Sequence, residues 1–138
     1  MKDFRLLAHT ADMGIEATGD SLAEVFVAAA QGLKNMIFGD AQVTPRQSAS
    51  VFLDSGDADE LLVAWLGEIL YLFEVRGLVP AEFVISEISE NALRGEVRGE
   101  PFDAKRHDIE REVKAVTYHQ LSVQQEAQGW RAKVYVDL

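Results

Sequence analysis

Two stretches in the first half of the chain carry apolar side chains at helical spacing. The first begins at Ser21, with a glutamate three residues later in the capping-box pattern, and stops before Gly39. The second begins at Asp57 with the same spacing, is apolar around much of its circumference and ends before Gly77. The sequence therefore predicts two helices, over about 21–38 and 57–75.

Alternating apolar and polar residues predict strands over most of the remaining chain. The pattern is most regular from Trp130 to Leu138, where every second residue is apolar, as in a strand with one buried face. Shorter stretches predict further strands at 4–10, 15–19, 48–54, 83–88, 93–97 and 113–125. Charged residues dominate 99–108, which we expect to be a surface loop.

These elements indicate an α+β fold with a largely antiparallel sheet and two helices packed against it. A chain of 138 residues fits a single domain over 1–138. No run of about 18 apolar residues suggests a membrane span, and the charged N-terminus does not resemble a signal peptide. Without cysteine there are no disulfides and no thiolate ligands. We expect a cytoplasmic protein.

The net charge is −10, from 23 acidic and 13 basic residues. Binding to nucleic acid draws much of its affinity from Lys and Arg on phosphates, so direct binding of RNA or DNA is not expected. An acidic surface suits a basic protein partner or cations, but solubility alone accounts for acidity in many proteins. The charge therefore argues against one class of partner and names none.

The sequence lacks the motifs of common enzymes. It has no phosphate-binding glycine loop, no dinucleotide fingerprint and no nucleophile elbow. Its three histidines, His9, His107 and His119, do not have the i, i+4 spacing of a zinc pair. A stand-alone enzyme is therefore poorly supported.

Acidic residues near the two ends of the chain form a candidate metal site. Asp12 precedes Gly14 between two predicted strands, where an aspartate often serves only to shape a turn. Asp137 lies on the polar face of the last predicted strand, and Leu138 adds backbone oxygens. If the first and last strands lie close, these oxygens suit Ca²⁺ or Mg²⁺ rather than zinc.

Lys114 is the second candidate, in the predicted strand 113–125. It could contact a phosphate or a carboxylate of a partner, although a polar strand residue often just faces water. In the charged loop before it, Asp103 and His107 could be secondary contacts, or the loop could be solvated surface.

Three stretches of the sequence resemble the archease family. His9–Ile15 is similar to its N-terminal motif, Val113–His119 to its most distinctive internal motif, and Val134–Leu138 to its C-terminal ending. The loop with Gly99–Pro101, Asp103 and His107 also fits. The resemblance runs along the whole chain in order.

The resemblance implies an accessory protein that promotes guanylylation and multiple turnover of an RtcB-type RNA ligase in tRNA splicing and RNA repair. It also implies a bound divalent cation, with calcium as the expected ion. The metal ligands would be Asp12, Asp137 and Leu138, with Lys114 as a further functional residue and His9 as a secondary one. GTP would belong to the ligase.

Two other functions remain open. A general chaperone or protein-interaction module predicts a broad exposed apolar patch. A metal-dependent hydrolase using Asp12 and Asp137 predicts turnover by the protein alone, and needs a base or nucleophile that the sequence does not provide.

Overall fold

The computed structural model describes residues 2–8 and 12–138, which form two helices and eight strands. Their order is β1 (Asp3–Ala8), β2 (Asp12–Gly19), α1 (Leu22–Phe38), β3 (Gln47–Asp54), α2 (Ala58–Arg76), β4 (Leu78–Ile88), β5 (Ala92–Pro101), β6 (Ala115–Val116), β7 (Ser122–Glu126) and β8 (Gly129–Asp137). No helix among these residues combines the length and apolar character needed to cross a membrane.

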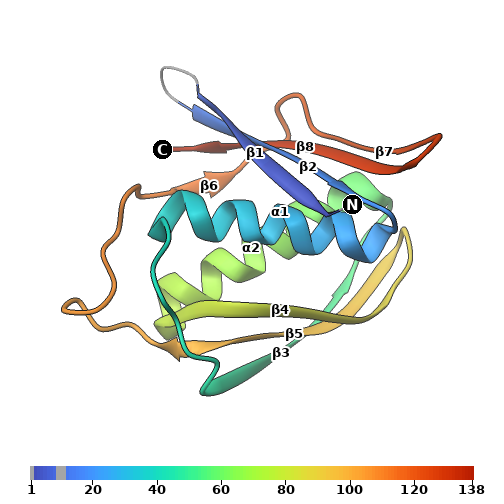
Figure 1. Ribbon diagram of the computed structural model, residues 1–138. Coiled ribbons are helices and arrows are strands. Elements are labelled where there is room, and N and C mark those ends of the chain that lie inside the picture. Colours follow the sequence, from blue (N-terminus) through green and yellow to red (C-terminus); the bar gives the residue numbers. More distant parts are fainter. Residues whose placement is uncertain (1, 9–11) are drawn as a thin grey trace.

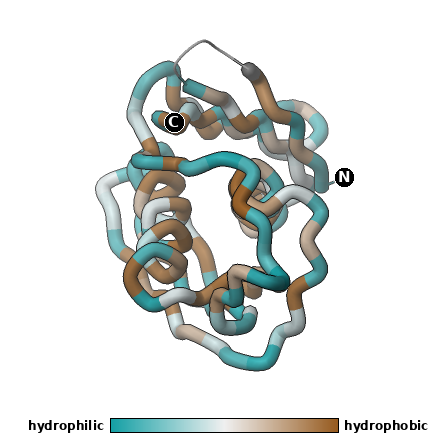
Figure 2. The backbone as a smooth tube through the Cα atoms, turned by 90° about the vertical axis from the view of Figure 1, so that its left-hand side faces the viewer, coloured by the Kyte–Doolittle hydropathy of each residue, from teal (hydrophilic) through white to brown (hydrophobic). Residues whose placement is uncertain are grey.

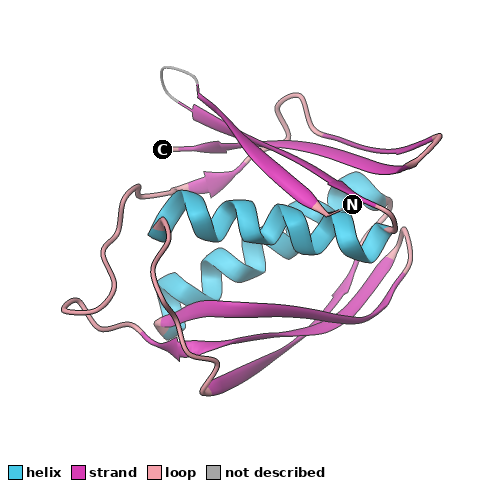
Figure 3. Cartoon of the chain, viewed as in Figure 1, coloured by secondary structure: helices cyan, strands magenta, loops and turns pink. Residues whose placement is uncertain are grey.

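The strands form two antiparallel sheets with both helices between them (Figures 1 and 3). The five-stranded sheet has the order β1-β2-β8-β6, with β7 also paired to β8, and the three-stranded sheet has the order β3-β5-β4. Helix α1 contacts β1, β2 and β8 on one side and β4 on the other, while α2 contacts both sheets and α1. The outer face of the five-stranded sheet is therefore left for solvent or a partner.

Both helices begin at the predicted caps. The side chain of Ser21 accepts the backbone N–H of Glu24 at 3.1 Å, and that of Asp57 accepts the N–H of Glu60 at 2.8 Å. Each bond satisfies a donor that the first helical turn leaves open. Helix α2 ends at Gly77, whose φ of 68° is the left-handed geometry that favours glycine at a helix end.

One hydrophobic core joins the helices to the inner faces of both sheets. Trp65 of α2 lies at its centre, fully buried, and its indole N–H donates to the carbonyl oxygen of Phe26 in α1 at 3.0 Å. Figure 2 shows hydrophobic positions along the helices, interspersed with hydrophilic ones. The helices thus share a buried polar contact as well as apolar packing.

The α+β class, the antiparallel pairing and the two helices are confirmed, but the sequence did not separate the strands into two sheets. The predicted strand 113–125 is wrong. Only Ala115–Val116 and Ser122–Glu126 are strands, and a turn containing Gln120 at φ 50° lies between them. The predicted loop 99–108 is also wrong at its start, because β5 continues to Pro101.

Candidate functional site

Asp12 and Asp137 are directly opposite each other across the β2–β8 pair. Their neighbours Met13 and Val136, also opposite each other, are buried against the core. Successive residues of a strand point to opposite faces, so the two aspartates lie together on the outer face of the sheet. Asp12 is half-buried and Asp137 is exposed. Side chains directly opposite have Cβ atoms about 4.5–5.5 Å apart.

A third segment brings Lys114 to the same place. In the short strand β6, Ala115 pairs with Asp137. The backbone N–H of Lys114 donates to the carbonyl oxygen of Asp137 at 2.8 Å. Asp12, Lys114, Asp137 and Leu138 therefore meet where β2 begins and β8 ends, and we call them the carboxylate corner. Their convergence is the geometry that the two-ended candidate site required.

The segment before Lys114 is fixed to the end of helix α1. The backbone N–H of Glu110 donates to the carbonyl oxygen of Ile37 at 2.7 Å, and the guanidinium of Arg111 donates to that of Met36 at 3.3 Å. Both acceptors are carbonyls of the last helical turn, which lack partners within the helix. The next residue but one, Val113, is buried in the core. This burial fixes the backbone position of Lys114, whose side chain is exposed.

The carboxylates of the corner are available for a ligand. Within residues 2–8 and 12–138, neither Asp12 nor Asp137 uses its side chain in a hydrogen bond or ion pair, and no three acidic or histidine side chains form a ready metal group. Two like charges directly opposite on a sheet destabilise it. A divalent cation fits this donor set because carboxylate and carbonyl oxygens are the ligands that Ca²⁺ and Mg²⁺ prefer. The backbone oxygens of Leu138 would add to two side chains.

A pocket of about 550 Å³ opens beside Lys114. It lies between the C-terminal parts of the two helices and the segment that follows β5. Apolar side chains form much of its wall, namely Ile37, Leu70, Phe73, Phe102, Ile109 and Val113. Arg111, Glu74 and Glu112 join Lys114 among its lining residues. The pocket has the size and mixed lining of a site for a small ligand or for one or two side chains of a partner.

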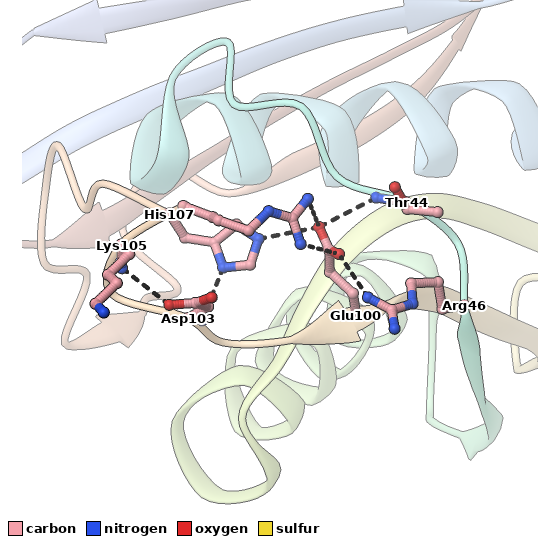
Figure 4. A network of polar contacts seen from close by, with 7 residues as sticks. Thr44, Arg46, Glu100, Asp103, Lys105 and His107 are labelled. Carbon is pink, nitrogen blue, oxygen red and sulfur yellow. Dashed lines mark hydrogen bonds and ion pairs between the residues drawn. The ribbon is translucent and has the colours of Figure 1, made fainter.

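A second charged cluster centres on the buried carboxylate of Glu100 (Figure 4). The two carboxylate oxygens of Glu100 accept hydrogen bonds from Arg106 at 2.7 and 3.1 Å, and one also accepts the backbone N–H of Thr44 at 3.2 Å. His107, 2% exposed, lies with Nε2 3.0 Å from the same carboxylate. We call these four residues the Glu100 network. Arg46 adds a more distant charge at 3.8 Å.

The contacts of the Glu100 network lower the pKa of its central carboxylate. Hydrogen bonds from Arg106 and then His107 hold the pKa of Glu100 at about 2, although burial acts in the opposite direction. The backbone N–H of Asp103 donates to Nδ1 of His107 at 2.9 Å. Nδ1 therefore carries a lone pair, and the proton of a neutral ring sits on Nε2, where it donates to Glu100. Both carboxylate oxygens of Glu100 therefore have partners within the chain.

The expectation that 99–108 is solvated surface is therefore wrong for Glu100 and His107. The sequence carries one weak signal for this network, an acid followed by Arg and His six and seven residues later, but that spacing does not reveal burial. Asp103 is exposed, and its carboxylate accepts the backbone N–H of Lys105 at 3.0 Å. His9, the remaining secondary candidate, lies outside the described residues.

Comparison with known proteins gives consistent matches over the whole length. The model of the archease protein family matches residues 4–138. Protein archease of Methanosarcina barkeri is 40% identical, with 99% of this chain and 97% of that protein covered. Protein archease of Pyrococcus furiosus is 33% identical over the full length of both.

Two solved structures share the fold. The solution structure of protein 1598 of Methanobacterium thermoautotrophicum superimposes with a TM-score of 0.84, at 33% identity and with both chains fully covered. The crystal structure of an archease from Thermotoga maritima, described as a possible chaperone, has a TM-score of 0.59 at 19% identity, with 97% of this chain and 96% of that chain covered.

Proposed function

The chain belongs to the archease protein family, and from that premise we propose that it is an accessory protein that activates an RtcB-type RNA ligase in tRNA splicing and RNA repair. The carboxylate corner is the part that acts on the ligase. It holds a divalent cation, calcium in our proposal, through Asp12, Asp137 and the backbone oxygens of Leu138. The observation that carries this proposal is the register that sets Asp12 opposite Asp137 with Lys114 bonded beside them.

The bound cation would supply positive charge for the phosphates of the GTP that the ligase holds. Lys114, exposed and fixed through its backbone, would contact a phosphate or a carboxylate of the ligase. Cations aimed at developing phosphate charge are the main means by which proteins assist transfer at phosphorus. The net charge of −10 favours docking on a basic protein surface, because complementary potentials speed encounter. Docking on such a surface would place the corner at the ligase without any contact to RNA.

The test measures guanylylation and multiple-turnover ligation by an RtcB-type ligase with and without this chain. Acceleration of both steps is the expected result. An unchanged ligase would refute the proposal, and turnover of phosphoester substrates by the chain alone would favour a metal-dependent hydrolase instead.

A general chaperone is the second candidate, and the pocket beside Lys114 is the observation that favours it. Its apolar wall could hold an exposed side chain of an unfolded client. Two of the exposed large apolar side chains, Phe102 and Ile109, line this pocket, and the others come from elsewhere in the chain, namely Phe52, Tyr71, Val75, Tyr118 and Leu138. Suppression of aggregation of several unrelated proteins, at concentrations that leave the ligase unaffected, would support the chaperone over the activator.

A further inference from the structure

The turn that follows β6 presents an aromatic side chain beside the carboxylate corner. Tyr118 is 66% exposed. Thr117, just before it, donates its backbone N–H to the carbonyl oxygen of Tyr135 at 2.9 Å. Tyr135 lies two residues before Asp137 on β8, and two strand residues span roughly 7 Å. Tyr118 and the corner therefore share one edge of the molecule.

Hydrogen bonds within the turn hold it in one shape. The hydroxyl of Thr117 donates to the carbonyl oxygen of Tyr135 at 3.0 Å and accepts the backbone N–H of His119 at 3.3 Å. The N–H of Leu121 donates to the carbonyl oxygen of Tyr118 at 3.3 Å. These bonds fix the backbone on both sides of Tyr118, so its side chain projects from an ordered support.

Side-chain packing anchors the same turn to the sheet. The ring of His119 meets the ring of Tyr135 edge-on, with centroids 5.8 Å apart. Tyr135 in turn lies over Gly14 of β2, where a Cβ atom would come within 2.9 Å of the ring. The absence of a side chain at Gly14 therefore leaves room for the ring of Tyr135, against which His119 packs. The turn and the two strands of the corner are one packed unit.

The turn also contains backbone strain. Gln120, at φ 50°, is the sole non-glycine residue with positive φ in the described parts of the chain. A residue with a side chain adopts this region at a cost and keeps it only where the surroundings hold it there. Such positions cluster at functional sites. At Gln120 the chain turns towards β7, and the side chain of Tyr118 stays exposed.

We propose that Tyr118 is the docking anchor of the carboxylate corner, entering a pocket on the ligase and so placing Lys114 and the aspartates at the ligase active site. This inference rests on the proposed function. Tyrosine suits the role because its rigid ring buries a large area at low entropic cost and its hydroxyl accepts or donates a hydrogen bond. A pre-ordered turn lowers the cost of binding further. The partner site needs apolar walls and a polar group at its base.

The experiment titrates wild-type chain and Tyr118→Ala into a fixed amount of ligase with GTP, and records the half-saturating concentration and the plateau rate of guanylylation. Phe52→Ala is the matched control, because Phe52 is 63% exposed but lies on β3 of the other sheet. Thermal unfolding checks that each variant is folded.

Tyr118→Ala is expected to raise the half-saturating concentration roughly 30-fold, the effect of truncating a strong anchor residue. Its plateau should stay within about twofold of wild type because the corner is intact, and Phe52→Ala should behave as wild type. Wild-type behaviour of Tyr118→Ala would overturn the docking role while leaving the proposed function standing. A wild-type chain that neither binds nor stimulates the ligase would overturn both.

Discussion

The carboxylate corner and the Glu100 network contain the same kinds of residue and use them differently. Glu100 is fully buried, and Arg106, His107 and Thr44 donate to its oxygens. Asp12 and Asp137 face each other on an outer surface, fixed by backbone pairing, with their carboxylates unengaged within residues 2–8 and 12–138. A carboxylate whose donors come from its own chain stabilises the fold. Asp12 and Asp137 have no such donor among the described residues, so this pair of opposed carboxylates is open to an external ligand.

The largest difference should appear when one carboxylate of the corner is neutralised. Asp12→Asn keeps the shape and removes a ligand charge, so affinity for Ca²⁺ should fall by at least about 100-fold, more than is usual for groups that merely support a ligand. Isothermal titration gives the affinity. Asp54→Asn, at the end of β3 opposite Ala92, is the control and should bind as wild type. Equal affinity in both variants would show that the corner does not bind the metal.

Replacing the lysine of the corner should separate metal binding from activation of the ligase. Lys114→Met is expected to retain Ca²⁺ and to lower the saturated rate of ligase guanylylation by about 100-fold, as when one charge-stabilising group is removed from an active site. Lys105→Met, an exposed lysine in the same segment, is the control. A Lys114→Met chain that stimulates fully would leave Lys114 without a role in the reaction.

The stability that the Glu100 network contributes should depend on pH. The folded pKa of Glu100 is about 2, below its ordinary value of 4.5, so the stability that it contributes is present above pH 4.5 and is lost as the pH falls through about 2. Glu100→Gln should be less stable than wild type at pH 7, and the difference should shrink as the pH falls towards 2. Urea unfolding midpoints at several pH values measure it. A constant difference from pH 7 to 2 would contradict the role of this ionised carboxylate.

The smallest effect concerns repulsion within the corner. With a chelator present, Asp137→Asn should stabilise the protein by about 0.2–1 kcal/mol, because like charges directly opposite on a sheet repel. In excess Ca²⁺ the wild type should instead be more stable than Asp137→Asn, since only the wild type gains the binding energy of the metal. Thermal unfolding under both conditions tests this reversal, and a variant that is less stable in chelator would argue against repulsion.

Local signals in the sequence predicted the helices well. Ser21 and Asp57 cap the first turn through side-chain bonds to residues three positions away, so no distant contact is needed to locate the helix starts. The predicted strand 113–125 is wrong because the chain turns at Gln120, after Thr117 has bonded to the carbonyl of Tyr135, which is distant in the sequence. The division into two sheets depends on such distant pairing as well.

For the candidate site too, features that depend on distant pairing could not be predicted from local sequence. Asp12 and Asp137 could be proposed as neighbours only on the condition that their strands pair, and the β2–β8 register meets that condition. Lys114 was assigned to a strand, whereas it lies just before β6. The Glu100 network was missed because a charged loop gives no sign of burial in its sequence. Metal binding and ligase activation remain predictions.

The most direct test of the central claim titrates the Asp12→Asn variant into an RtcB-type ligase with GTP and follows formation of the guanylylated ligase to saturation. The corner is proposed to act through its bound cation. At a Ca²⁺ concentration that fills the wild-type site but not the weakened one, the variant should therefore fold as wild type and give no stimulation at any protein concentration. Full stimulation by folded Asp12→Asn would contradict the claim.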